Sequence, residues 1–251
     1  MAEFLQNITF AEASIIWVVV ILAAVLRSFT GFGFALAAVP AFSLFLSPIQ
    51  AVVLVSLLTL AINLFYARNY LTNVPLNPLI PLVVAAVIGT IIGTQVIKSI
   101  SVEKFQFWVG CSVIAGCLGM IFLRKIRIPV NNFTTYLTGF LSGIMNGSLA
   151  IPGPPIIIYA LQSQSTPEKS RILLMTFFFA SAFIALISYC FAGFVTMQSL
   201  WFFLMAFPAM LIGDRLGFYL FNQYGSAFYR TIAISCLLVI GILITLKSIL
   251  Y

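Results

Sequence analysis

The stretch Arg27-Ser-Phe-Thr-Gly-Phe-Gly33 divides two apolar runs, residues 14–26 and 34–46, that are each too short to cross a membrane as a helix. At 1.5 Å per residue, a helix of about 13 residues spans about 20 Å of a hydrocarbon core that is about 30 Å thick. The dividing stretch is too polar and too rich in glycine to continue a helix smoothly. We therefore expect a broken or re-entrant helix pair with its tip at residues 27–33.

A second interruption of the same kind lies in the other half of the chain. The stretch Ala150-Ile-Pro-Gly-Pro-Pro155 divides apolar runs at 133–149 and 155–161, and its prolines remove backbone donors and break the helix. A shift of 119 residues (from 31 to 150) places Gly31–Pro40 on Ala150–Tyr159. The sequence thus predicts two homologous halves, 1–125 and 126–251, in one integral membrane domain. Each half has a broken pair, with tips at 27–33 and 146–154, followed by three transmembrane helices.

The composition supports an all-α polytopic membrane protein. Of 251 residues, 63% are hydrophobic and 7% are charged, against about 25% charged in an ordinary soluble domain. The net charge of +7 is not clustered as nucleic-acid binding requires. The four cysteines show no CxxC spacing and the chain has no histidine, so we expect neither a metal site nor another cofactor.

The distribution of basic residues favours inverted halves. If each broken pair enters and leaves on one side, eight basic residues outside Arg27 share one side of the membrane and three lie on the other. The eight are Arg68, Arg124, Lys125, Arg127, Lys169, Arg171, Arg215 and Arg230, and the three are Lys98, Lys104 and Lys247. If each pair counts instead as one crossing, the sides hold about six and five. The positive-inside rule favours the first layout, with both termini outside.

The two tips together are suited to an anion. Non-helical backbone at membrane depth must line a cavity or be buried in protein, and pairs that enter from opposite faces bring their tips together near the midplane. A helix that begins after a tip points free N–H groups and a partial positive charge into that space. An intramembrane arginine such as Arg27 marks a functional site by default, and its planar fork matches sulfonate, carboxylate or phosphate groups.

The candidate substrate-binding residues come from both tips, and the repeat places Asn146 opposite Arg27. They are Arg27, Ser28, Thr30, Gly31, Gly33, Asn146, Gly147, Ser148, Pro152, Gly153 and Pro154. An alternative remains open at this point, in which Arg27 snorkels to the interface or forms a structural pair. Asp214 is interpreted as an interfacial ion-pair partner of its neighbour Arg215, and a proton relay at Asp214 is the alternative that stays open. The GxxxG pairs at 89/93, 143/147 and 213/217 are interpreted as helix-packing faces.

Two stretches resemble the signature of a known family. Both Arg27-Ser-Phe-Thr-Gly-Phe-Gly-Phe-Ala-Leu-Ala-Ala-Val-Pro40 and Gly143-Ile-Met-Asn-Gly-Ser-Leu-Ala-Ile-Pro-Gly-Pro-Pro-Ile-Ile-Ile-Tyr159 are similar to the glycine-rich motifs of the TauE/SafE sulfite exporter family. The resemblance covers essentially the whole chain. It implies a multi-pass carrier of small sulfur-containing anions (sulfite, sulfoacetate and related organosulfonates such as 4-toluenesulfonate) in a bacterial inner membrane. Where the family usually has a run of consecutive glycines, this chain has Gly31-Phe-Gly33 in the first stretch and Ala150-Ile-Pro-Gly-Pro154 in the second.

Other functional classes make different predictions. Metalloprotease and Ser–His chemistry need histidine, and an intramembrane aspartyl protease needs two aspartates where this chain has one, so we expect no enzyme. A non-transporting accessory or scaffold subunit would have tightly packed, dry tips. A carrier of a small non-sulfur carboxylate would share the anion site. Coupling to protons or sodium, the direction of transport and assembly as a homodimer stay open, and the lipid bilayer is the expected surrounding.

Overall fold

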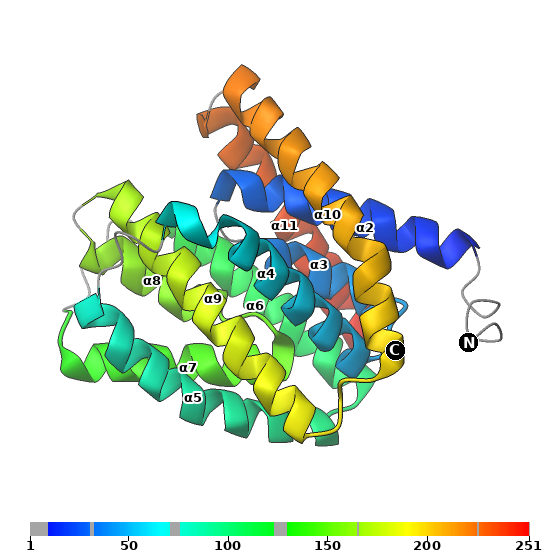
Figure 1. Ribbon diagram of the computed structural model, residues 1–251, viewed down its shortest axis with the longest axis horizontal. Helices are drawn as coiled ribbons and strands as arrows, with labels where there is room; N and C mark the ends of the chain where they lie inside the picture. The colour runs from blue at the N-terminus through cyan, green and yellow to red at the C-terminus, as the bar shows by residue number, and fades with distance from the viewer. Residues whose placement is uncertain are drawn as a thin grey trace.

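The chain folds into a bundle of helices (Figure 1). The computed structural model describes residues 10–30, 33–70, 76–122, 130–164, 166–224 and 226–250, and within these ranges it holds ten helices and no strand. The helices are α2 (Phe10–Thr30), α3 (Phe34–Phe42), α4 (Pro48–Tyr70), α5 (Leu76–Ser99), α6 (Val102–Phe122), α7 (Asn132–Leu149), α8 (Gly153–Ser163), α9 (Pro167–Phe191), α10 (Met197–Tyr224) and α11 (Ser226–Leu250). The all-helical expectation is confirmed.

Four of the described helices are long and apolar enough to cross a membrane. They lie at Pro48–Arg68, Asn77–Ser99, Glu168–Phe191 and Met197–Leu220, and shorter apolar helices lie at Ala13–Ser28 and Ser235–Ser248. Together with the composition, these helices make the chain a membrane protein.

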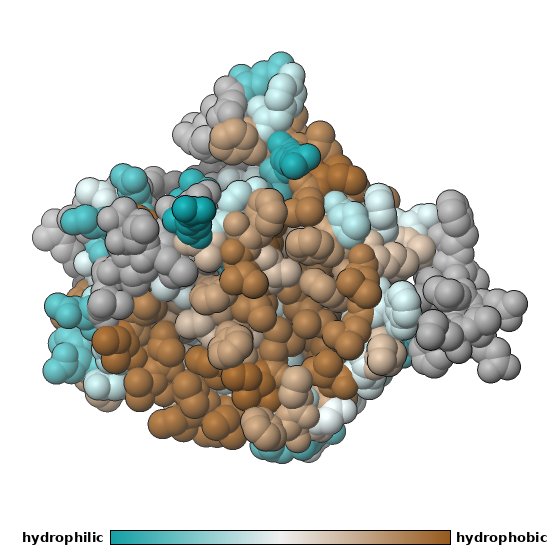
Figure 2. Space-filling view, viewed as in Figure 1, coloured by the Kyte–Doolittle hydropathy of each residue, from teal (hydrophilic) through white to brown (hydrophobic). Residues whose placement is uncertain are grey.

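The outer surface is apolar where helices face outward. On α5, Ile80, Val84, Ile88 and Ile91 are each more than half exposed, and their spacing of three or four residues places them on one face of the helix. Figure 2 shows a broad hydrophobic surface with hydrophilic residues gathered toward its rim. A water-exposed surface of this kind would be costly, whereas lipid chains cover it without loss.

Two of the helix pairs that pack through glycine run parallel, and α5–α7 is the first of them. A Cβ added to Gly89 would meet the backbone of Phe140 and Gly143, and one added to Gly93 would meet the backbone of Ile144 and Ser148. The residue numbers of the two helices rise together along this contact, so α5 and α7 run parallel. Missing Cβ atoms let the two backbones approach this closely.

The pair formed by α2 and α10 repeats this arrangement at the other side of the molecule (Figure 1). A Cβ on Gly213 would collide with Ile21 and Ala24, and one on Gly217 would collide with Ser28. These contacts confirm that the GxxxG glycines at 89/93, 143/147 and 213/217 are packing faces.

Two further pairs run antiparallel. Gly110 of α6 faces Thr245 of α11, whereas Ile114, one turn later, faces Gly241, one turn earlier. At the start of α4, the Gln50 side-chain amide donates to Gln198 Oε1 at 3.2 Å. Because Gln198 lies in the first turn of α10, after the short connection 192–196 that follows α9, the start of α4 lies at the same end of the bundle as the end of α9. The packed helices α4 and α9 therefore also run antiparallel.

The short helices α3 and α8 lead to opposite ends of the bundle. Beyond the end of α3, the Ser43 carbonyl oxygen accepts a hydrogen bond from Gln106 Nε2 near the start of α6. Near the end of α8, the Ala160 carbonyl oxygen accepts one from the Ser170 hydroxyl near the start of α9. With 9 and 11 residues, these helices are about 14 and 16 Å long, about half the thickness of a hydrocarbon core.

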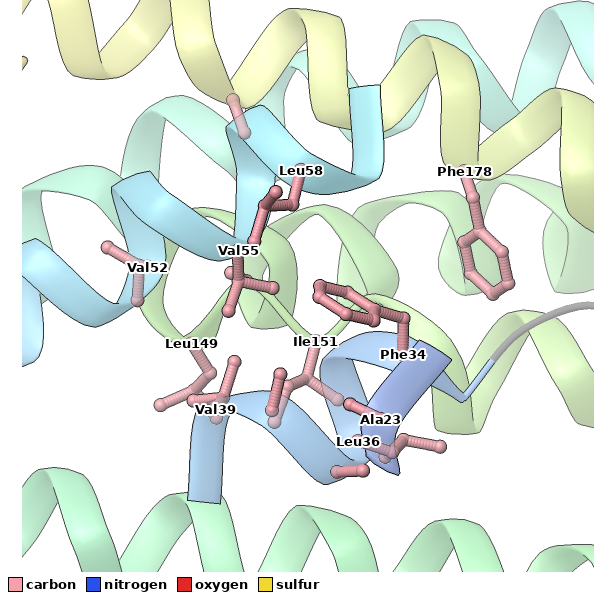
Figure 3. Close-up of a cluster of buried hydrophobic side chains, with 14 of the residues drawn as sticks. Ala23, Phe34, Leu36, Val39, Val52, Val55, Leu58, Leu149, Ile151 and Phe178 are labelled. Carbon is pink, nitrogen blue, oxygen red and sulfur yellow. The ribbon is translucent and has the colours of Figure 1, made fainter. Parts of the chain in front are cut away.

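The core of the molecule surrounds these short helices. Phe34, Leu36 and Val39 of α3 pack among buried side chains of α4 and of the segment after α7, as Figure 3 shows for Val55 and Ile151. Seven of the nine residues of α3 are buried, which explains why its sequence has no polar stripe. Gly153 and Pro154 at the start of α8 are buried as well, so both helix starts lie in the interior.

Candidate functional site

The first break is shorter than the sequence indicates. Helix α2 continues through Arg27 and Ser28 to Thr30, so that the predicted tip 27–33 is helical over its first four residues. Gly33 then caps α3 with a φ of 112°, a left-handed conformation that glycine adopts without steric cost. Residues 31 and 32 lie outside the described part of the chain.

The second break also begins later than expected. Helix α7 continues through the predicted tip residues 146–149, and Ala150 then ends it in the left-handed region with a φ of 54°. The Ala150 amide still donates to the Asn146 carbonyl oxygen at 2.8 Å. After Ile151 and Pro152, α8 begins at Gly153. Between α7 and α8, the chain is therefore non-helical only over residues 150–152.

The helices run on because their polar side chains find partners within the same helix. The Ser28 hydroxyl donates to the Val25 carbonyl oxygen at 2.8 Å, and the Ser148 hydroxyl donates to the Ile144 carbonyl oxygen at 2.7 Å. Such bonds allow serine inside a buried helix. Among the described residues, the helices are interrupted at Gly33 and near Pro152, where backbone conformation or a missing donor requires it.

A cavity of about 40 Å³ lies where the two breaks meet. By this measure a water molecule needs about 10–15 Å³, so the space holds a few waters or a small ion. Its lining combines both tips with polar and apolar side chains of α4 and α9. The lining residues are Arg27, Gly33, Phe34, Ala35, Leu36, Ser56, Thr59, Asn63, Asn146, Ala150, Ile151, Pro152, Gly153, Phe178, Ser181 and Ala182.

Two helix N-termini begin at this cavity. Neither Gly33 nor Pro152, the residues before α3 and α8, caps its helix with a side-chain hydrogen bond, and the first residues of both helices line the space. The first-turn N–H groups of a helix and its partial positive charge favour an anion. In α8 the second and third residues are proline and lack the N–H, so α3 offers more backbone donors than α8.

Arg27 connects the cavity to a buried polar cluster. Its Nη1 donates to Asp214 Oδ1 at 2.9 Å and its Nη2 donates to Asn63 Oδ1 at 3.3 Å. The Tyr66 hydroxyl donates to Asp214 Oδ2 at 2.6 Å, and the Arg27 guanidinium lies 5.9 Å from the centre of the Tyr66 ring. The side chains of Arg27 and Asp214 are 7% and 8% exposed. The cluster joins α2, α4 and α10.

The prediction that Asp214 pairs with Arg215 was wrong. Asp214 pairs with Arg27 of α2, whereas its sequence neighbour Arg215 is exposed. The reason is the close parallel packing of α2 on α10, where Gly213 allows the backbone of Ile21 to approach. This packing brings Arg27 beside Asp214. Arg27 thus has the structural pairing that the sequence left as an alternative, and it lines the cavity as well.

The structure brings five of the predicted site residues to the cavity and places others around it. Arg27, Gly33, Asn146, Pro152 and Gly153 line the space. Four others are described but are not among the lining residues, namely Ser28, Gly147, Ser148 and Pro154. Gly31 and the side chain of Thr30 lie outside the described part of the chain.

The residues beside the cavity have structural partners of their own. Ser28 lies against Gly217 of α10, and Gly147 lies against the Thr90 backbone of α5. Asn146 lines the cavity but also donates through Nδ2 to the Ser181 carbonyl oxygen at 2.7 Å. These contacts position the tips against the surrounding helices.

Sequence reasoning missed the contribution of α4. Ser56, Thr59 and Asn63 line the cavity from one face of this helix, since they are three or four residues apart. Asn63 is an amide within the apolar run 51–66, which is a signal that could have indicated a polar site. The Thr59 hydroxyl oxygen is buried and has no hydrogen-bond partner, so it is available to a molecule in the cavity.

These features define an integral membrane protein with a small anion-compatible cavity at the centre of its helices. The family model described as Sulfite exporter TauE/SafE matches residues 16–244. The chain therefore belongs to the TauE/SafE sulfite exporter family, a family of membrane transporters, which agrees with the expectation that it is not an enzyme. No curated protein and no solved structure matches the chain.

Proposed function

We propose that this protein is a secondary transporter of small sulfur-containing anions, such as sulfite, sulfoacetate or related organosulfonates, in a bacterial inner membrane. The family membership supports an anion exporter of the sulfite type. In the proposed mechanism, one anion binds near the membrane midplane between the two helix breaks. Access to it alternates between the two sides.

The observation that carries this proposal is the cavity between the breaks. It combines the Arg27 guanidinium with the starts of α3 and α8. A guanidinium donates two parallel hydrogen bonds to two oxygens of one sulfite or sulfonate group, and the backbone N–H groups of Phe34 and Ala35 add donors on the α3 side. We propose Arg27, Gly33, Asn146, Pro152 and Gly153 as the surfaces that contact the anion.

The predicted site residues beside the cavity have a supporting role in this proposal. Ser28, Gly147, Ser148 and Pro154 hold the tips against neighbouring helices, and Thr30 and Gly31 belong to the first tip by sequence. Thr59 and Asn63 join the site from α4.

Inverted repeats are the proposed basis of alternating access. If helices α2–α6 are matched in order with α7–α11, the parallel pair α5–α7 corresponds to the parallel pair α10–α2. In the antiparallel pairs α4–α9 and α6–α11, each helix is packed against its own counterpart. Two equivalent helices that run antiparallel are expected of halves with opposite orientations in the membrane. The starts of α3 and α8 also differ by 119 residues, the offset of the sequence repeat.

The cavity favours a carrier over an accessory or scaffold subunit. A scaffold has no need of space at the breaks, and we expected it to be dry and tightly packed there. The buried Thr59 hydroxyl without a partner and the Arg27 guanidinium at this space are instead consistent with a polar occupant, because buried polar groups are normally hydrogen-bonded.

The test is counterflow of radiolabelled sulfite into proteoliposomes. Vesicles that hold unlabelled sulfite are expected to take up the label faster than protein-free vesicles, and the uptake should saturate. Unlabelled sulfoacetate, taurine, sulfate, chloride and acetate, added outside in turn, would rank the anions and separate sulfur anions from simple carboxylates. Label uptake equal to that of protein-free vesicles would contradict the carrier proposal and support the scaffold.

A further inference from the structure

Asp214 is a buried carboxylate that the proposed anion site does not contain. Both of its oxygens are held, Oδ1 by Arg27 at 2.9 Å and Oδ2 by the Tyr66 hydroxyl at 2.6 Å. Its side chain is 8% exposed. An acid at such a position inside a membrane protein is costly, and it is retained where it has a function.

The same guanidinium serves both the carboxylate and the cavity. Arg27 lines the cavity, whereas Asp214 is not among the lining residues. As long as Asp214 is ionised, the positive charge of Arg27 is already balanced, because the two groups form an ion pair. An anion that binds Arg27 from the cavity therefore adds one negative charge to the buried cluster.

That extra buried charge has to be removed for tight binding. An uncompensated charge in a medium of low dielectric is strongly unfavourable, and two anions that share one site favour the protonation of one of them. A sulfonate or a singly charged hydrogensulfite ion is a much weaker base than a carboxylate, so the proton goes to the carboxylate. With Asp214 neutral, Arg27 and a singly charged anion again form a balanced pair.

We infer that Asp214 is the coupling residue of this transporter, taking up one proton for each anion that binds at Arg27. This inference rests on the proposed function. The proton comes from water on the side to which the cavity is open and binds Oδ1, the oxygen that Arg27 releases when Nη1 turns to the anion. Tyr66 keeps its own proton and continues to donate to Oδ2. When the anion leaves, the proton leaves Asp214 on the same side, and Arg27 pairs with the carboxylate again.

Among the side chains that the structure describes, few charged or titratable groups surround Asp214. Arg27 faces it from α2 and Tyr66 from α4. Arg68, in the last turn of α4, and Arg215, next in the chain, are exposed. Among the described side chains of α11, 235–248, the titratable ones are Cys236, which is exposed, and Lys247, which lies in the last turn.

The experiment counts protons on sulfite binding to the purified full-length protein. Calorimetric titrations in buffers of different ionisation heat give the protons taken up per sulfite bound, for the wild type and for Asp214→Asn. Sulfite's own protonation is the same in both titrations at one pH, so the difference isolates Asp214. We expect one more proton in the wild type. Relative to that of the variant, the apparent affinity of the wild type should fall about tenfold for each unit by which the pH rises, because each anion binds together with one proton.

Transport gives a second readout. In proteoliposomes with an imposed pH gradient, the wild type should accumulate sulfite above equilibrium, whereas Asp214→Asn should exchange sulfite without accumulating it beyond the level set by sulfite's own titration. Glu168→Gln is the matched control, because Glu168 is an exposed acid in the first turn of α9. It should behave as the wild type.

Each result decides between the proposals. Two results would overturn the coupling role and leave the transporter proposal intact. They are equal proton counts in wild type and Asp214→Asn, and accumulation by the variant beyond the level set by sulfite's own titration. A wild type that neither binds nor exchanges sulfite would overturn both. If Asp214→Asn does not fold, the wild-type count is compared with the titration of free sulfite at the same pH. An excess of one proton supports the inference, and no excess overturns it.

Discussion

At the scale of single residues, Arg27 has two roles whose effects cannot be separated by a single substitution. It lines the cavity, and it also balances the buried charge of Asp214. Removing one partner of a buried ion pair typically costs about 3–5 kcal/mol, because a charge is left without compensation. Loss of transport in a single Arg27 variant therefore mixes folding with binding.

A double variant separates the two roles. Arg27→Ala should lower the free energy of unfolding by about 3–5 kcal/mol, whereas Arg27→Met with Asp214→Leu should restore most of that stability and still fail to exchange sulfite. Stability is measured by thermal unfolding in detergent, and exchange is measured by counterflow. Arg68→Ala, at an exposed arginine of α4, is the control for charge alone. Undiminished exchange by the double variant would remove Arg27 from the anion site.

At the scale of helices, glycine decides which pairs come into contact. A Cβ on Gly93 would collide with the backbone of Ile144 and Ser148, so α5 and α7 can approach only without it. The position of α7, and with it Asn146 and the second break, depends on this contact. Asn131 adds local support by capping the start of α7 through Thr134.

Substitution of Gly93 should therefore be destabilising although the residue has no side chain to lose. We expect Gly93→Ala to lower the free energy of unfolding by about 1–3 kcal/mol, since the methyl group forces two packed backbones apart. Gly116→Ala is the matched control within a helix, because its Cβ would meet Pro154 Cγ at an ordinary 3.4 Å. That change should be neutral or stabilising by about 0.5–1 kcal/mol. Equal melting temperatures for the two variants would contradict the packing argument.

At the scale of the whole molecule, the α3–α4, α5–α6 and α9–α10 connections lie at one end of the bundle. Lys98, at the end of α5, lies over the ring of Phe194 in the α9–α10 connection at 5.7 Å, and Gln50 bonds to Gln198. The α8–α9 connection lies at the other end, where α8 leads to the start of α9. The inverted layout assigns the first end to the outside and the second to the cytoplasm.

Cysteine labelling in intact cells tests this assignment. In a background where the four native cysteines are serine, Ser101→Cys should react with an impermeant maleimide from outside. Lys169→Cys should react only after permeabilisation. Both positions are exposed. Labelling of both positions from the same side would rule out inverted halves and favour a layout in which each broken pair makes one crossing.

The sequence by itself determined the helical class, the membrane setting and the places where helices break. Each of these follows from local chemistry. The relevant properties are the length of the apolar runs, the conformational freedom of Gly33 and the backbone N–H groups that the prolines after residue 151 lack. The offset of 119 residues between the starts of α3 and α8 was also readable, because the two interruptions have similar sequences.

Only the tertiary structure decided how long the breaks are and which charges meet. Ser28 and Ser148 bond to their own helices, so polar residues that indicated a tip became part of a helix. Asp214 lies 187 residues from Arg27 in the chain, and their pairing depends on parallel packing of α2 and α10. Local patterns carry no information about such a contact, because it is fixed by which glycine-bearing surfaces fit together in space.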